Sequence, residues 1–205
     1  MRVLATWLVC LSAAGCADDG SAPAQQPPAK SADDSGRALP IEARETAVAI
    51  VLRQLVAAQA QFQAAGFADE NRNGIGEYGG FGELVGRTPV RGAKALDRAL
   101  LPPAFRDIRS GVVRRVGYVF RMGLPTKRGY ETEQRDGGYA AGRVDAARAE
   151  TLWRCHAWPE TDGATGRVFF VDQSGDVMRT VKASALRPTV DYAPDRVAGG
   201  WEIVR

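Results

Sequence analysis

Residues 40–66 constrain the fold most, because their apolar side chains recur at the spacing of an α-helix. Pro40 suits the first turn of a helix, and Gly66 is a natural stop. The residues of the apolar stripe are Val48, Val51, Leu52, Leu55, Ala58, Gln59 and Phe62. Such a stripe has to be covered, either by the core of the same domain or by a partner protein.

The pattern changes to a period of two in the second half of the chain, which predicts β-strands. In residues 112–124 the apolar face comprises Val116, Tyr118, Phe120 and Met122. Further strands are expected at residues 151–158, 166–171 and 177–182, with a hairpin turn at 172–176 and a short last strand at 201–204. A short helix is expected near residues 93–101, and residues 123–149 read as a long irregular connection. One long helix followed by strands predicts an α+β fold: one N-terminal amphipathic helix packed on an antiparallel sheet of about four strands.

The first fifteen residues have the composition of an export signal. Met1-Arg2 supplies a positive charge, and residues 3–14 form an apolar run shorter than the roughly 20 residues that a membrane-spanning helix needs. The run ends in Ala13-Ala14-Gly15-Cys16, which resembles the lipobox of bacterial lipoproteins. That resemblance implies that residues 1–15 are a signal peptide and that Cys16 carries the lipid. The alternative is a plain secretory leader cleaved near Ala14.

Residues 16–37 are expected to form a lipidated flexible tether, because they contain almost no large apolar side chain. The folded domain then comprises residues 38–205. Diacylglycerol and a further acyl chain together give three chains, which is more than the two membrane-binding signals that stable anchoring requires. We therefore expect a protein anchored to a membrane of the cell envelope, on its periplasmic or outer side. Of the three cysteines, Cys10 lies in the leader and Cys16 is acylated, so Cys155 has no partner for an intramolecular disulfide.

The polar segment 69–77 is the best candidate for a site. Asp69, Asn71 and Asn73 place side-chain oxygens at alternate positions, as in a loop that wraps calcium. Ile75 would add its backbone carbonyl and Glu77 a further carboxylate. With two carboxylates at most, the affinity for calcium would be weak. The alternative is a turn in which the Asp and Asn side chains cap their own backbone.

Other combinations of reactive residues do not predict catalysis. Cys155 and His156 are neighbours on a strand and therefore point to opposite faces, so the imidazole cannot activate the thiol. His156 is the only histidine, and we expect it at the surface, with Cys155 in the core. Ser174 lies in a predicted turn without a nucleophile motif. The net charge of +3, without clusters of Lys and Arg, does not indicate nucleic-acid binding.

The order of helix, Asp/Asn-rich loop and antiparallel strands resembles the globular part of type II secretion pseudopilins and type IV pilins. The residues that carry this resemblance are 57–62, leading into Asp69-x-Asn71-x-Asn73-Gly74 and Glu77-Tyr78. Residues 117–122 and 157–159 are similar to an uncharacterised group of exported proteins common in planctomycetes. Pseudopilins imply a calcium-dependent, filament-forming scaffold. Filament assembly is not expected here, because the helix follows a polar tether and carries Glu42, Arg44, Glu45 and Arg53.

The sequence thus favours a non-enzymatic envelope protein, a structural or interaction module with a protein partner in the envelope. The alternative is a binding module for a glycan or a peptide that uses residues 79–92 or 123–149, with calcium as its candidate cofactor.

Overall fold

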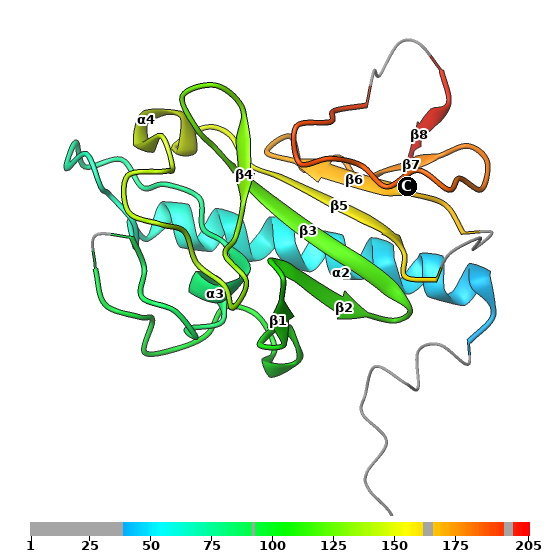
Figure 1. The fold of residues 1–205 in the computed structure, drawn as a ribbon, viewed down its shortest axis with the longest axis horizontal. Helices are drawn as coiled ribbons and strands as arrows, with labels where there is room; N and C mark the ends of the chain where they lie inside the picture. The colour runs from blue at the N-terminus through cyan, green and yellow to red at the C-terminus, as the bar shows by residue number, and fades with distance from the viewer. Residues whose placement is uncertain (1–38, 92, 162–165, 195–198) are drawn as a thin grey trace, which may run out of the picture.

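The computed structural model describes residues 39–91, 93–161, 166–194 and 199–205. The expected signal peptide, the tether and Cys16 lie outside these residues. The described elements form one mixed structure, with a long helix lying across one face of an antiparallel sheet (Figure 1). In the part of the chain that is described, no helix is both long and apolar enough to cross a bilayer.

The N-terminal helix α2 (Ile41–Ala64) confirms the helix expected at residues 40–66. All seven residues of the predicted stripe are buried. The stripe packs into the main core against the sheet, and its closest strand partner is β6 (Phe169–Asp172). The domain's own core therefore covers the stripe, which leaves it inaccessible to a partner.

The sheet has eight strands among the described residues, so the expectation of about four was wrong. The other strands are β1 (Ile108–Arg109), β2 (Val112–Arg115), β3 (Tyr118–Pro125), β4 (Tyr130–Thr132), β5 (Arg154–Pro159), β7 (Met178–Thr180) and β8 (Trp201–Ile203). Their order is β1-β2-β3-β5-β6-β7-β8, and all pairings are antiparallel. β4 pairs with the C-terminal half of β3, beside the half that pairs with β2.

The strand expected at residues 112–124 is a hairpin. Val116 and Gly117 have φ angles of 49° and 74°, and Arg115 pairs with Tyr118 across them. Positive φ at both central residues is the mark of a type I′ turn, whose twist matches that of a hairpin. The alternation within β3 itself is as expected, with Tyr118, Phe120 and Met122 in the core below the sheet.

Three short helices complete the described part of the fold: α3 (Phe81–Leu84), the 3₁₀ turn η1 (Pro103–Phe105) and α4 (Ala146–Ala149). No helix forms at residues 93–101, although one was expected there; the described residues of this stretch have no regular structure. The segment 123–149 is less irregular than expected, since it contains the end of β3, β4 and α4.

The two faces of the sheet bury different sets of side chains. The inner face, towards α2, contributes to the main core. The outer face carries a smaller cluster made of Val112, Val119, Trp158 and Val168, with Trp201 packed against it. Both faces of the central strands are therefore covered, and every residue of β5 after Arg154 is buried.

Candidate functional site

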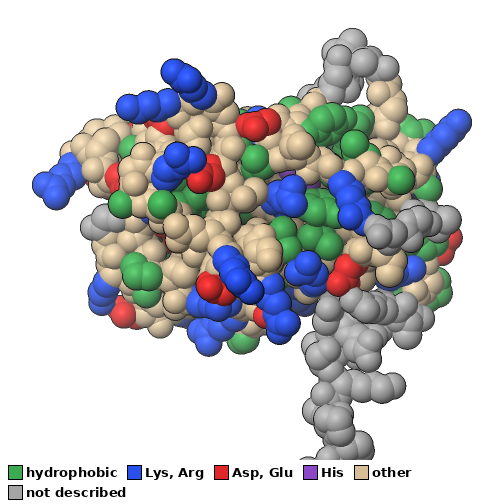
Figure 2. Space-filling view, in the orientation of Figure 1, with side chains coloured by type: hydrophobic (Ala, Val, Ile, Leu, Met, Phe, Trp, Pro, Cys, Tyr) green, Lys and Arg blue, Asp and Glu red, His purple; other side chains and the backbone are tan. Residues whose placement is uncertain are grey.

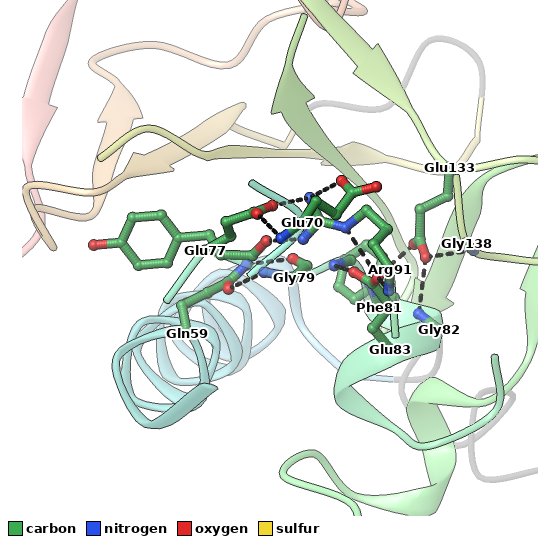
Figure 3. Close-up of polar contacts among 12 residues, drawn as sticks. Gln59, Glu70, Glu77, Gly79, Phe81, Gly82, Glu83, Arg91, Glu133 and Gly138 are labelled. Atoms are coloured by element: carbon green, nitrogen blue, oxygen red, sulfur yellow. Dashed lines mark hydrogen bonds and ion pairs between the residues drawn. The ribbon is translucent and has the colours of Figure 1, made fainter. Parts of the chain in front are cut away.

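Four charged side chains are buried together between α2, α3 and β4, and we call them the Arg91 cluster: Glu77, Glu83, Arg91 and Glu133. Figure 3 shows them with the backbone groups that they contact. Charged residues are seldom buried unless they are paired, because removing a charge from water is costly. The cluster is therefore the part of the molecule in which polar chemistry is most concentrated.

Arg91 lies at the centre and joins two carboxylates. Its Nη1 is 3.0 Å from Oε2 of Glu77, and its Nε donates to Oε1 of Glu83 at 3.0 Å. Glu83 also accepts from the backbone N–H groups of Arg91 and Gly80, at 2.9 and 2.8 Å. The contact with Gly80 closes the N-terminus of α3, where an acidic side chain at the third helical position caps the first free N–H.

Glu133 is held by backbone donors and has no cationic partner of its own in the contacts described. Its carboxylate accepts from the N–H groups of Phe81, Gly82 and Gly138, at 3.0, 2.8 and 2.9 Å. Burial raises the pKa of Glu133 to about 7, although these backbone hydrogen bonds act in the opposite direction. Burial likewise raises the pKa of Glu77. The region thus holds more acidic than basic groups out of water.

Gln59 connects this region to the helix. Its amide donates to the carbonyl of Gly79 at 2.7 Å and accepts from the N–H of Gly79 at 3.0 Å. Together with the Arg91 cluster, this pair ties the loop that follows α2 to both α2 and α3. Every carboxylate described here is engaged by donors from the protein itself, so the arrangement orders the loops that it joins.

The sequence predicted none of these roles. Glu83, Arg91 and Glu133 lie in segments without periodicity, where charged residues are normally exposed. The one local signal is Gly80-x-x-Glu83, which has the spacing of a capping box. Gln59 is an exception, because its position in the apolar stripe predicted its burial.

The predicted calcium loop is a set of backbone-capping turns. Asp69 accepts from the N–H groups of Asn73 and Gly74, both at 3.0 Å. Asn71 Oδ1 accepts from Asn73 N, and Asn73 Oδ1 accepts from Ile75 N. The amides of Asn71 and Asn73 donate to Glu150. This is the geometry of the alternative given above, in which Asp and Asn cap their own loop.

Glu77 does not point towards the side-chain oxygens of Asp69, Asn71 and Asn73. Its side chain is fully buried, where Oε1 accepts from Glu70 N at 2.6 Å and Oε2 faces Arg91. Ile75 is half exposed. Within the described residues, no group of three or more His, Cys, Asp or Glu side chains is arranged to hold a metal. Calcium binding by Asp69, Asn71, Asn73, Ile75 and Glu77 stays a prediction.

The structure places Cys155 and His156 on opposite faces of β5, as expected for strand neighbours. Cys155 is buried in the main core, and burial raises the pKa of its thiol. The expectation that His156 lies at the surface was wrong, since it is fully buried on the outer face. Ser174 lies in the turn between β6 and β7, where its hydroxyl accepts from Asp176 N.

The visible surface carries charges of both signs. Figure 2 shows basic side chains over much of one face, with acidic ones among them. Two pairs near β1 and β2 illustrate this: Arg109 is 2.8 Å from Asp107, and Arg114 is 3.3 Å from Glu160. Pairing of this kind reduces the field that a basic surface projects into solvent.

Comparison of the chain with models of known protein families, with curated proteins and with solved structures found no match in any of the three.

Proposed function

We propose that this protein is exported, anchored to a membrane of the cell envelope through a lipid on Cys16, and that its folded domain serves as a structural or interaction module. The observation that carries the proposal is Ala13-Ala14-Gly15-Cys16, which directly follows a charged start and a short apolar run. The polar segment that follows supplies the spacer between a lipid and a folded domain.

The interior of the domain supports a non-catalytic role. The side chains best suited to acid–base chemistry are the buried carboxylates of the Arg91 cluster. Glu83 and Glu133 accept five hydrogen bonds from backbone N–H groups and a sixth from the side chain of Arg91, which commits their oxygens to holding loops together. Under this proposal the surface of the ordered domain meets the partner. The pilin-like fold remains part of the proposal and is limited to the arrangement of a helix on an antiparallel sheet.

Lipidation is tested by metabolic labelling with a fatty-acid probe. Cys16→Ser removes the thiol to which the lipid would be attached, so labelling is expected to be lost. Cys10→Ser is the matched control, because Cys10 lies within the leader, and labelling should persist. Wild-type protein that is exported but unlabelled would contradict the anchor and favour plain secretion.

The role of the domain is tested by cross-linking in whole cells. An envelope protein recovered at fixed stoichiometry with wild type, and lost with Cys16→Ser, is the expected result. Binding of the purified protein to a glycan array, without such a partner, would favour the alternative of a ligand-binding module.

A further inference from the structure

Residues 188–192 cross the outer face of the sheet, and we call this segment the strap. It belongs to the orange-red part of the chain in Figure 1, between β7 and β8. Side chains of the sheet hold it by its backbone carbonyls. Arg121 of β3 donates to the carbonyl of Pro188 at 3.3 Å, and Arg154 of β5 donates to those of Asp191 and Tyr192 at 2.8 and 3.3 Å.

The strap does not extend the ladder of the sheet. The backbone hydrogen bond described within it, from Tyr192 N to Thr189 O, is internal. Its other anchors are the carboxylate of Asp191, which accepts from Tyr130 N, and Val190, whose Cγ2 lies close above the backbone of Gly123. Lifting the strap would break these contacts and leave the pairing of β3, β5 and β6 intact.

His156 lies beneath the strap and contacts it directly. Its Nε2 is 2.9 Å from the carbonyl oxygen of Tyr192, so the proton of the neutral ring is on Nε2. The ring is 5.1 Å from that of Phe170 in β6 and 6.2 Å from that of Tyr192. Its Nδ1 is buried and has no hydrogen-bond partner among the described residues. A second proton on the ring would have no acceptor there.

We propose that the strap is an acid-sensitive latch, in which protonation of His156 releases residues 188–192 from the outer face of the sheet.

The charges around His156 favour this behaviour. Arg121 of β3 pairs with His156 across the two strands, and Arg154 lies two residues before it on the same face of β5, so both positive charges disfavour a charged ring, while β6 contributes the uncharged Phe170. The strap contributes Tyr192 and Asp191, whose Oδ1 accepts from Tyr130 N at 2.6 Å. A charged imidazole would thus be a third cation in a site closed to water. Release of the strap restores water to the ring. It breaks no hydrogen bond between the ring and a carboxylate, since none is present among the described residues.

The direction of the pH dependence follows from linkage. Burial lowers the pKa of His156 from 6.5 to about 4, with Arg154 and Arg121 acting in the same direction. A lowered pKa means that His156 favours the closed strap above pH 6.5 and that this contribution is lost as the pH falls towards 4. Such a difference allows the opening equilibrium to rise by about two orders of magnitude over this range.

Because His156 is the only histidine, NMR of its ring reports on the latch without ambiguity. We would titrate the full chain in detergent micelles and follow contacts of the His156 ring with Tyr192 and Phe170. On protonation, well below pH 6.5, the contact with Tyr192 should disappear while the contact with Phe170 persists. Titration at 6.5, persistence of the Tyr192 contact, or simultaneous loss of both contacts would overturn the proposal.

Two variants separate the latch from general acid instability. His156→Gln keeps a donor for the Tyr192 carbonyl but cannot be protonated, so the strap should stay closed at pH 4. The indole N–H of Trp201, 3.1 Å from the Tyr192 hydroxyl, reports the closed state in this variant. Asp191→Ala removes the anchor on Tyr130 N, which should weaken the closed state and raise the pKa of His156 towards 6.5. Opening of His156→Gln at the same pH as wild type, or an unchanged His156 pKa in Asp191→Ala, would contradict the latch.

Discussion

Nη1 of Arg91 lies 3.0 Å from Oε2 of Glu77, and their side chains are only 5% and 0% exposed. Such a pair contributes little net stability compared with apolar residues of the same shape, but each partner depends on the other. The same guanidinium neutralises Glu83, so a single cation serves two buried carboxylates. Substituting Arg91 therefore tests how strongly the loops that contain Glu77 and Glu83 depend on this cation.

Arg91→Met is therefore expected to destabilise the protein strongly. The change leaves Glu77 and Glu83 buried without a cation, which costs about 3–5 kcal/mol when one partner of a buried pair is lost. The measurement is the free energy of unfolding in urea. Arg109→Met is the matched control, because Arg109 and Asp107 form an exposed pair, and it should leave stability unchanged. Equal effects of the two substitutions would contradict the central role of Arg91.

Glu133 is expected to make stability fall as the pH rises. Its pKa is raised by burial from 4.5 to about 7, so its contribution is complete below pH 4.5 and lost as the pH rises through 7. Glu133→Gln removes this titration. The stability of wild type relative to Glu133→Gln should therefore decrease between pH 4.5 and 7, by an amount on the order of 3 kcal/mol. Comparing the two proteins at each pH cancels the opposite contribution of His156. Parallel pH profiles would show that Glu133 titrates normally.

Gly76 is expected to tolerate no side chain. A Cβ there would lie 1.9 Å from the carbonyl oxygen of Gln63, a backbone atom at the end of α2. Gly76→Ala should cost about 3 kcal/mol, because the carbonyl of Gln63 accepts from Gly66 N and the adjacent Glu77 N donates to Ala68, so a shift of either backbone disturbs a hydrogen bond. Gly74→Ala in the same loop meets open space and pays only for its positive φ of 83°, about 1 kcal/mol. Thermal unfolding of both variants tests this, and a more severe effect at Gly74 would refute the close approach.

The thiol of Cys155 is expected to be unreactive in the folded protein. It is fully buried, and burial raises its pKa, so the thiolate that attacks a disulfide reagent is scarce. A thiol-modifying reagent followed by peptide mass spectrometry should leave Cys155 unmodified in native protein and modify it fully in urea. Rapid modification of the native chain would mean that β5 opens far more readily than its central position in the sheet implies.

The sequence predicted the secondary structure and the buried face correctly where an apolar pattern was compatible with only one regular structure. The stripe from Val48 to Phe62 specified α2 and its buried face, and the alternation of Tyr118, Phe120 and Met122 specified the inner face of β3. It failed at Val116-Gly117, because a β-branched residue at positive φ is unusual and the turn lacks the Asn or Asp that normally marks it. That missed turn also concealed part of the true number of strands.

The candidate site was beyond the reach of local patterns. Glu83, Arg91 and Glu133 come together only when α3 and β4 meet, and nothing in their separate segments distinguishes them from solvated charges. His156 was assigned to the wrong environment for the same reason. Alternation correctly placed it opposite Cys155, but the strap that buries it comes from residues 188–192. Contacts between such distant segments are set by the tertiary fold.

The path of α2 has a consequence for the order in which the chain can fold. A chain is synthesised from its N-terminus, so this helix emerges before the strands of the sheet, with its apolar stripe complete. Its main strand partner, β6, begins at Phe169, more than a hundred residues after the helix ends. The hairpins from β1 to β3, by contrast, close through two-residue turns as soon as they appear. The nascent protein therefore carries this helix without its main strand partner while the intervening residues are made, which gives a chaperone a defined segment to hold until β6 arrives.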